Sequence, residues 1–417
     1  MKTIHRNISK SLLLFVFLFS TMSAYAQDSY FTVSGIVKDR LTRKPLEYVT
    51  ITLVGHNIGT VSNADGEFTL KIPKTINAAS VECSHLGYTS FRIPVKGENI
   101  SGAEALLTPV AGTLSEVVIR GWDAYYLVLE AVNKIPKNYC ATPAQLTGFY
   151  RETVQKRRNF INITEAVIDM YKTAYSENSD RDRVQILKGR KLLSQRAADT
   201  LAVKLLGGPN LSIFVDIVKN PDVLLDRETL SDFSFKMEDL TEINGRTQYV
   251  VTFKPQSVKP YPLYFGTFYI DKESLAFTRA EFRLDMTDRN KASEMILRKK
   301  PIGLRFQPEE VSYVINYQER GGVNYLSYIR NEIQFKCDWR RRLFSTNYAI
   351  VSEMVATDVN TQNVTAIPRK EAFSSNQVLG DRVMDFYDED FWGAYNIIEP
   401  TESLESAVAK LKKQQRN

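Results

Sequence analysis

Histidine is scarce in this sequence. The 417 residues contain only His5, His56 and His85, so everything after residue 85 lacks it. A zinc peptidase or a Ser-His-Asp hydrolase needs a histidine at its pocket. HExxH, GxSxG and phosphate-binding glycine motifs are also absent. We therefore predict that the chain is not an enzyme and has no cofactor and no metal site, although a site built from His56 and His85 remains an alternative.

Cysteine is equally rare. Cys83, Cys140 and Cys337 share no CxxC spacing, and their number is odd. A fold built on disulfides is therefore excluded for a chain of this length, and one bridge would have a pairing that the sequence does not reveal. The favoured interpretation is three small buried hydrophobic residues.

Long apolar runs are missing except at the start. Basic residues at 2, 6 and 10 precede the apolar run Leu12–Phe19, and Ala24-Tyr25-Ala26 offers small residues at both cleavage positions. This order is typical of a secretory signal peptide that is cleaved before Gln27. The run is too short for a membrane span, which needs about 20 residues. We predict an exported protein, in the periplasm or associated with the outer membrane, whose mature chain has no transmembrane helix.

An excess of one charge is lacking too. The chain has 54 basic and 48 acidic residues, and removal of residues 1–26 takes away three basic ones, leaving a net charge of +3. This near balance gives no reason to expect nucleic acid as a partner.

Short strands separated by turns fill residues 31–108. Val49, Ile51 and Leu53 alternate with threonines, which is the period of a half-buried strand, and Asn63-Ala64-Asp65-Gly66 predicts a hairpin turn. About seven such strands within about 75 residues predict a two-sheet sandwich.

These residues also carry a family resemblance. The motifs Gly35-Ile36-Val37-Lys38-Asp39, Pro45-Leu46, Asp65-Gly66-Glu67-Phe68, Leu86-Gly87-Tyr88 and Leu114-Ser115-Glu116-Val117-Val118 follow one another in order. The segment resembles the carboxypeptidase-regulatory-like domain common in envelope proteins of the Bacteroidetes. The resemblance implies a transthyretin-like antiparallel sandwich of seven strands that is an accessory module without peptidase chemistry. In that family the module often precedes a large transporter barrel, but the remaining residues are too few for 22 strands.

The rest of the chain reads as β-rich. Hairpins are predicted for Phe149 with Phe160–Tyr171, for Phe265–Ile270 with Thr278–Leu284, and for Val311–Tyr317 with Tyr325–Phe335. Asn347–Val355 is the last clear strand. A helix capped by Asp123 is expected before the sheet, and Ala197–Leu206 and Leu211–Val218 suit helices lying over it. Such a meander predicts an antiparallel sheet with one wet face.

Two further resemblances concern this second part. The segment Tyr264–Leu284, with a Gly-x-Phe-Tyr-Ile-Asp turn at 266–271 and a second strand after it, resembles the periplasmic lipoprotein-carrier half-barrel family. The chain also resembles uncharacterised two-part Bacteroidetes proteins with a Phe-Tyr-Arg-Glu segment and an aromatic segment at Phe391–Asn396.

The expected fold is mainly β, with an N-terminal transthyretin-like sandwich and a larger antiparallel half-barrel with helices. The predicted division is a signal peptide at 1–26, the sandwich at 27–119, a helical linker at 120–146, a β-rich domain at 147–400 with a helical insertion near 191–230, and a C-terminal helix at 401–417.

Few residues stand out as ligand or partner contacts. The candidates are Arg151, Glu152, Glu165, Trp339, Arg340 and Trp392. The first three could line a pocket or form an ion-pair network between strands. Trp339 and the arginines after it could meet anionic lipid phosphates or form a solvated loop. The acidic residues 385–390 could bind Ca²⁺ or a sugar, or form a solvated turn with buried aromatics.

These observations favour a non-catalytic envelope protein that binds a lipophilic ligand, a glycan or an envelope partner on the concave face of the second domain. The rival is a carboxylate-based glycan hydrolase, which needs two facing carboxylates in a pocket. A structural adaptor without any cavity is a third hypothesis.

Overall fold

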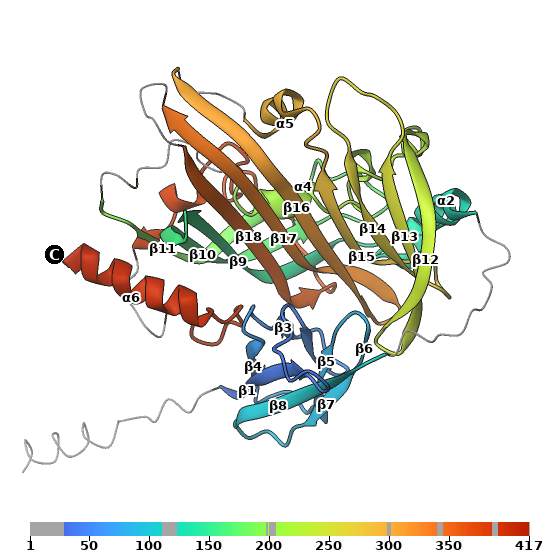
Figure 1. Cartoon of the computed structure of the whole chain (residues 1–417). Coiled ribbons are helices and arrows are strands. Elements are labelled where there is room, and N and C mark those ends of the chain that lie inside the picture. The colour runs from blue at the N-terminus through green and yellow to red at the C-terminus, as the bar shows by residue number, and fades with distance from the viewer. Residues whose placement is uncertain are drawn as a thin grey trace, which may run out of the picture.

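The computed structural model describes residues 29–110, 123–196, 199, 206–297, 302–339, 345–385 and 391–416. The predicted signal peptide and the motif at 114–118 lie outside these residues. Within them the protein consists of a small β-sandwich and a larger open sheet, with short helices against the larger sheet (Figure 1). None of the helices that the structure describes is long and apolar enough to span a membrane.

The sandwich has two four-stranded sheets, ordered β4-β1-β8-β6 and β3-β2-β5-β7. The strands are β1 (Tyr30–Asp39), β2 (Thr50–Leu53), β3 (Gly59–Val61), β4 (Glu67–Pro73), β5 (Ser80–Ser84), β6 (Tyr88–Thr89), β7 (Phe91–Pro94) and β8 (Ile100–Pro109). Alternate residues point into one core, as Phe68, Leu70 and Ile72 do in β4. No residue larger than glycine fits at Gly35 of β1, because a Cβ there would lie 2.0 Å from the Ala103 carbonyl oxygen.

The predicted turn at Asn63–Gly66 exists, but it is not a hairpin. It connects β3 to β4, which belong to different sheets, so the prediction of a hairpin was wrong. The Asn63 side chain holds the turn by accepting hydrogen bonds from the amides of Asp65 and Glu67, both at 2.9 Å. Gly66 provides the positive φ of 78°. Local residues encode the turn, but the sheet that each strand joins depends on distant partners.

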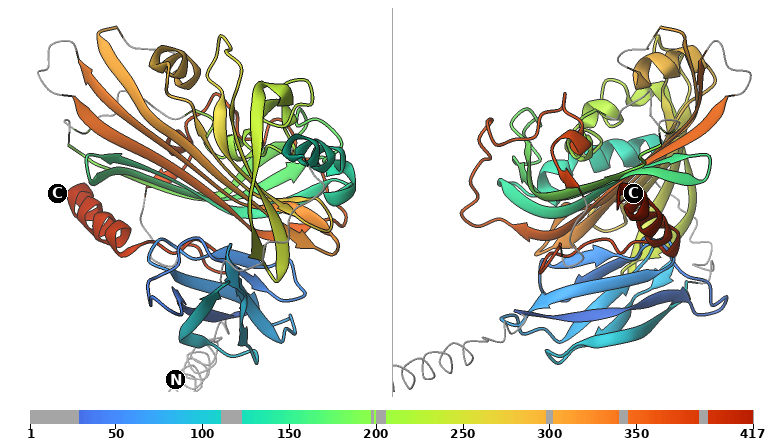
Figure 2. Two further views of the ribbon diagram at one scale, coloured as in Figure 1. Left: turned by 45° about the vertical axis from the view of Figure 1, so that its right-hand side comes forward. Right: turned by 90° about the vertical axis from the view of Figure 1, so that its left-hand side faces the viewer.

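One sheet of eleven strands forms the second part, in the order β12-β13-β14-β15-β16-β17-β18-β9-β10-β11-β19. The strands are β9 (Ala144–Lys156), β10 (Asn159–Lys172), β11 (Arg183–Leu193), β12 (Phe233–Ile243), β13 (Arg246–Pro255), β14 (Tyr264–Asp271), β15 (Phe277–Leu284), β16 (Leu304–Arg320), β17 (Val323–Trp339), β18 (Thr346–Asn360) and β19 (Met384–Asp385). The three predicted hairpins are confirmed by the pairings β9–β10, β14–β15 and β16–β17. Figures 1 and 2 show the sheet curling into a half-barrel, as expected.

Helices accompany this sheet. They are α2 (Ala124–Asn133), α3 (Ile135–Asn138), α4 (Asn210–Phe214), α5 (Arg289–Ile296) and α6 (Glu402–Arg416), with 3₁₀ turns η2 (Pro221–Val223), η3 (Leu230–Asp232) and η4 (Leu379–Asp381). Asp123 caps α2 as predicted, because its carboxylate accepts the amide of Tyr125 at 2.9 Å. The segment expected to be a linker does more than connect, since Leu127, Val128 and Ile135 belong to the core of the half-barrel.

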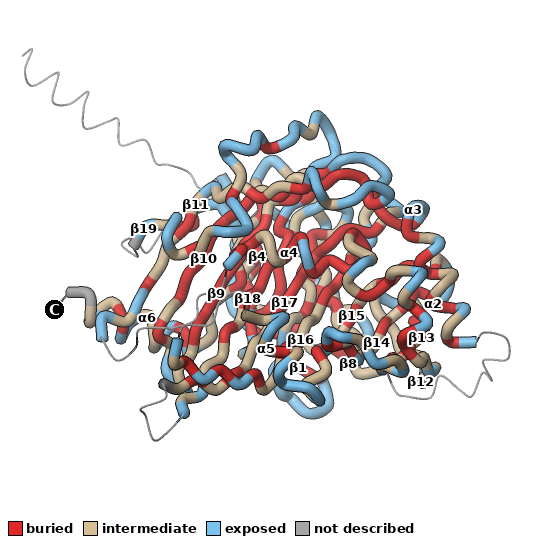
Figure 3. Tube along the Cα trace, turned by 90° about the horizontal axis from the view of Figure 1, so that it is seen from above, coloured by how far each residue is buried: buried red, intermediate tan, exposed pale blue. Residues whose placement is uncertain are grey.

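The two faces of the half-barrel have different partners. On β9, Tyr150 points into the large core on the concave face, whereas Phe149 points to the convex face. On the convex face Phe149 and Tyr328 contact Val61 of the sandwich and Trp392 of the C-terminal segment. Leu404 and Leu411 of α6 pack on Ile163 and Leu192 at the same face. The predicted docking of the C-terminal helix is confirmed. Figure 3 shows buried residues running along the middle strands of the half-barrel, which are covered on both faces.

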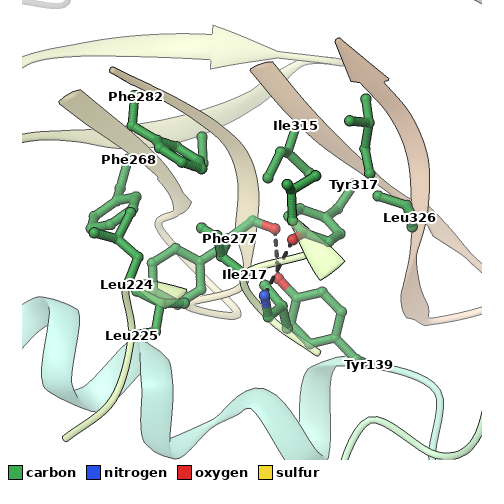
Figure 4. Close-up of a cluster of buried hydrophobic side chains, with 14 of the residues drawn as sticks. Tyr139, Ile217, Leu224, Leu225, Phe268, Phe277, Phe282, Ile315, Tyr317 and Leu326 are labelled. Carbon is green, nitrogen blue, oxygen red and sulfur yellow. Dashed lines mark hydrogen bonds between the residues drawn. The ribbon is translucent and has the colours of Figure 1, made fainter. Parts of the chain in front are cut away.

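The segment between β11 and β12 enters the concave side and fills part of it. Ile217, Leu224 and Leu225 pack against Phe268 and Phe277 of the half-barrel (Figure 4). Tyr139 closes the cluster by donating a hydrogen bond from its hydroxyl to the carbonyl oxygen of Phe277 at 2.6 Å. Residues 211–232 therefore act as a plug over one end of the concave face.

Four buried charges fix this plug to the sheet. Asp216 of the plug pairs with Lys172 of β10 at 2.8 Å and accepts a hydrogen bond from the Tyr317 hydroxyl at 2.7 Å. Lys219 donates to the Thr173 hydroxyl at 2.8 Å and lies 4.0 Å from Asp182. All four charged side chains are at most 1% exposed. Two cations face two anions, so the group has no net charge and each member has compensation for lost hydration.

This cluster explains why the predicted helical insertion was wrong in extent. Strand β11 continues to Leu193, beyond the expected start of the insertion at residue 191, and α4 covers only Asn210–Phe214. After α4 the chain continues in turns instead of a helix, and the side chains of Asp216 and Lys219 reach Lys172 and Thr173 from there. The first expected helix, Ala197–Leu206, lies almost entirely outside the described residues, and β12 was not predicted.

Replacement of Asp216 by alanine leaves Lys172 buried without its closest partner. Removal of one member of a buried pair costs about 3–5 kcal/mol. We expect D216A to lower the free energy of unfolding by that amount in urea denaturation. The control is E177A, which removes the exposed side-chain pair of Glu177 with Arg181 and should cost less than about 1 kcal/mol. Equal stability of the two variants would contradict a structural role for the cluster.

Candidate functional site

A cavity of about 780 Å³ lies on the part of the concave face that the plug leaves uncovered. Strands β14 to β18 provide one wall, and α4, α5 and residues 375–376 provide the other. The lining residues are Leu206, Gly207, Asn210, Leu211, Phe214, Tyr264, Leu284, Met295, Ile296, Leu297, Phe306, Val311, Tyr313, Asn331, Ile333, Phe335, Ile350, Ser375 and Asn376. None of these described lining residues carries a charge, so the cavity suits an apolar ligand.

Differences in strand length create this space. Strands β16 and β17 have 17 residues each, whereas β14 and β15 have eight. The register pairs Arg283 of β15 with Ser312 of β16, so residues 304–310 continue past the end of β15, roughly 23 Å at about 3.3 Å per residue. Figure 1 shows the long strands projecting beyond the short ones. The extra length carries apolar residues on its inner face that the plug does not cover.

Aromatic rings pack against one another in the wall of the cavity and next to it. Phe306 lies 4.9 Å from Phe335 between ring centroids, and Phe282 lies 4.9 Å from Tyr313. Burial raises the pKa of Tyr264 to about 12, so its hydroxyl stays neutral. Aromatic side chains have few rotatable bonds and pack on one another, which favours a preformed cavity.

One row of polar side chains crosses the inner face. Tyr313, Asn331, Ser352, Glu152 and Thr164 are direct cross-strand neighbours on β16, β17, β18, β9 and β10. Asn331 lines the cavity, and Glu152 lies two strands further along the row. Among the described residues, Glu152 Oε2, Asn331 Oδ1 and the Tyr150 hydroxyl are buried without a hydrogen-bond partner.

Glu152 is therefore an unusual carboxyl group. It is 3% exposed, and burial raises its pKa to about 7. The sequence singled out Glu152 but grouped it with Arg151 and Glu165. The structure separates them, because adjacent residues of a strand point to opposite faces.

Arg151 and Glu165 meet on the convex face. The Glu165 carboxylate accepts from Arg151 Nε and from Arg190 Nε, each at 2.8 Å, and both arginines hold its pKa below the usual value despite burial. Arg151 also donates to the carbonyl oxygen of Ile398 at 2.7 Å. These side chains form an ion-pair network beneath the C-terminal segment, so they do not line the cavity.

Trp392 joins the same network. Its ring is 4.8 Å from the Arg190 guanidinium carbon and 5.3 Å from the Phe149 ring, and the side chain is 5% exposed. Trp392 fastens the segment after residue 390 to the sheet. Of the other candidates, the Trp339 side chain and Arg340 lie outside what the structure describes, as do the Asp385 side chain and residues 386–390.

Residues 391–402 join the sandwich to the half-barrel. The Asn396 side chain accepts from the Lys71 amide at 2.7 Å and donates to the Lys71 carbonyl at 3.0 Å, as a neighbouring strand would. Thr60 and Asn63 of the sandwich donate to the carbonyls of Ile397 and Pro400 at 2.8 Å and 2.9 Å. We call residues 391–402 the strap.

A smaller cavity, of about 110 Å³, lies where the sandwich meets β13 to β17. His85 lines it, and burial together with Arg279 lowers the His85 pKa to about 4. Asp271 in the same lining is already paired with Arg246 at 2.7 Å. Among the described residues no three His, Cys, Asp or Glu side chains gather as metal ligands would.

The three cysteines are free and buried, as the favoured interpretation predicted. Cys83 is part of the sandwich core, and burial raises its pKa to about 12. Sequence reasoning missed Asn331 and the cavity around it. A signal was present, because Ile329, Asn331, Ile333 and Phe335 place one polar residue in an otherwise apolar stripe at period two.

The fold and site define a two-part, mainly β protein with a docked sandwich and an open half-barrel that holds an apolar cavity. Residues 33–119 match the family model described as the CarboxypepD_reg-like domain, which confirms the resemblance of the first part. No curated protein matches the chain.

Solved structures provide distant matches. A DUF1329 family protein from Desulfovibrio piger is 8% identical, with 58% of this chain and 95% of that chain covered and a TM-score of 0.26. A putative membrane-associated protein of unknown function from Bacteroides fragilis is 9% identical, with 79% and 98% covered and a TM-score of 0.16. Lipovitellin, in a structure titled for lipid-protein interactions, is 7% identical, with 61% and 28% covered and a TM-score of 0.24. Similarities this low carry no argument about function, and the likeness to lipoprotein carriers stays a prediction.

The raised pKa of Glu152 predicts a pH-dependent stability. The folded state binds the proton more tightly than the unfolded state, so the stabilisation is complete below about pH 4.5 and is lost as the pH rises through about 7. We expect E152Q to gain roughly 2–3 kcal/mol relative to the wild type between pH 4.5 and pH 8. Urea denaturation at several pH values tests this. The exposed Glu294 provides the control E294Q, and parallel pH profiles for all three proteins would contradict the assignment.

The Asn396 contact predicts how firmly the strap holds the sandwich. N396A removes two hydrogen bonds, and each contributes about 1 kcal/mol. We expect hydrogen exchange at the Lys71 amide to accelerate about tenfold or more, measured by mass spectrometry, while N290A on the exposed surface of α5 leaves it unchanged. Unaltered exchange at Lys71 in N396A would show that the strap does not hold β4.

Proposed function

We propose that the protein is exported to the cell envelope and binds a lipophilic ligand in the half-barrel cavity without transforming it. The cavity carries this proposal, since about 780 Å³ lined by uncharged and mostly apolar side chains is a volume that a lipid-sized molecule would occupy. The apolar run and small residues before Gln27 support export.

The composition of the cavity favours binding over glycan hydrolysis. A glycosidase needs two carboxyl groups on either side of the scissile bond, and none of the described residues lining the cavity is Asp or Glu. Sugar hydroxyls also need many hydrogen-bonding partners, whereas the inner wall offers rows of aromatic and branched aliphatic side chains. An adaptor without any cavity is disfavoured by the same observation.

A binding experiment with a neutral fluorescent probe tests the proposal. N-phenyl-1-naphthylamine brightens in apolar surroundings and has no charge. We expect the chain from Gln27 to bind it with a micromolar dissociation constant. I333W places a larger side chain in the cavity and should weaken binding at least tenfold, because the filled volume excludes the ring system.

The matched control is Q334W on the same strand. Gln334 is the next residue and points to the convex face, so the same substitution there should leave probe binding unchanged. Absence of probe binding by the wild type, or equal loss in both variants, would refute a lipophile site in the cavity. A co-purifying lipophile in native mass spectra of the protein taken from its own envelope would further support it.

A further inference from the structure

We infer that the ligand is a single-chain amphiphile with an uncharged hydrogen-bonding head, such as a hydroxyl or an amide, and that this head binds at Asn331. This rests on the proposed function and specifies its ligand. The geometry that carries it is the polar row across the inner face, which begins at the cavity with Asn331 and continues to Glu152.

Asn331 is the first part of the argument. Its side chain is 2% exposed, lines the cavity, and has a buried amide oxygen without a partner among the described residues. A buried polar group without a hydrogen bond costs about 1–3 kcal/mol. The stability of the fold does not explain an asparagine at this position, because an apolar residue of the same shape, such as leucine, would pack there without this cost. A ligand atom that bonds to Asn331 would offset the cost.

The neighbours of Asn331 restrict where such a head can lie. The cross-strand row on one side contains Val311, Ile333, Ile350 and Val154, and the row on the other contains Ile315, Ile329, Met354 and Tyr150. The polar row is therefore a narrow band between two mostly apolar ones. A chain of methylene groups fits along the apolar wall, and only the end that reaches the band can be polar.

Charge decides the class of head group. The described lining residues include no lysine or arginine, so a phosphate or carboxylate would enter without a counter-charge. Glu152 lies two strands from Asn331 on the same face and would repel an anion when ionised. A neutral head avoids both costs and can hydrogen-bond to the amide of Asn331, which both donates and accepts.

Displacement of the naphthylamine probe by three ligands of eight carbon atoms each tests the inference. The ligands are octan-1-ol, 1-chlorooctane and octanoate. We expect octan-1-ol to bind the wild type at least tenfold more tightly than octanoate. In N331L the preference for octan-1-ol over 1-chlorooctane should fall about fivefold to tenfold, because one buried hydrogen bond is lost. Q334L on the convex face should keep the wild-type preference.

Unfolding experiments separate a ligand role from a structural one. Leucine has nearly the shape of asparagine, so N331L should be at least as stable as the wild type if Asn331 has no partner in the free protein. A destabilised N331L would assign Asn331 a structural role and overturn the inference. If the probe binds but all three ligands displace it with equal affinity, the inference is overturned while the proposed function stands. The same holds if N331L keeps the wild-type preference for octan-1-ol. No probe binding at all would refute the proposed function itself.

Discussion

The carboxylate of Asp216 joins the plug, which lies inside the half-barrel, to the sheet around it. An open sheet of eleven strands exposes the concave face to water unless another part of the chain covers it. The plug at 211–232 covers one end, and its position depends on the pairing of Asp216 with Lys172 and Tyr317. Because charges buried this deeply are costly without partners, any placement of the plug that separated Asp216 from Lys172 would be unfavourable. The cavity is the remainder of the concave face that the plug leaves free.

Local patterns predicted most of the strands but not their assembly. Period-two alternation and turn residues located the hairpins β9–β10, β14–β15 and β16–β17 correctly. The same reasoning failed between residues 183 and 243, where it extended a helix through Asp216 and missed β12. There the conformation follows from distant partners such as Lys172 and Tyr317, which no local window contains. The link between β3 and β4 in the sandwich also shows this limit, since the turn at Asn63 was recognised and its connection between two sheets was not.

The candidate site was predictable only in part. Arg151, Glu165 and Trp392 do lie together, but on the convex face, where they hold the strap. Glu152 points the other way because of strand alternation, and Asn331 was passed over because a single asparagine is an ordinary residue in sequence. What distinguishes Asn331 is its burial without a partner, which appears only when the side chains of several strands are placed in space.

The strap has a consequence for the order in which the chain assembles. The hydrogen bonds from Thr60 and Asn63 reach residues 337 positions later in the sequence. The sandwich contains its own core at residues 30–109 and can fold early, yet its contacts with the strap await residues 391–402, which are synthesised after all the long strands of the half-barrel. Contacts of such long sequence separation form slowly because the intervening chain loses entropy when they close. Before the strap forms, only direct contacts such as the hydrogen bond from Asn57 to the Val359 carbonyl hold the sandwich to the half-barrel, so closure of the strap is expected to be a late step that strengthens this joint.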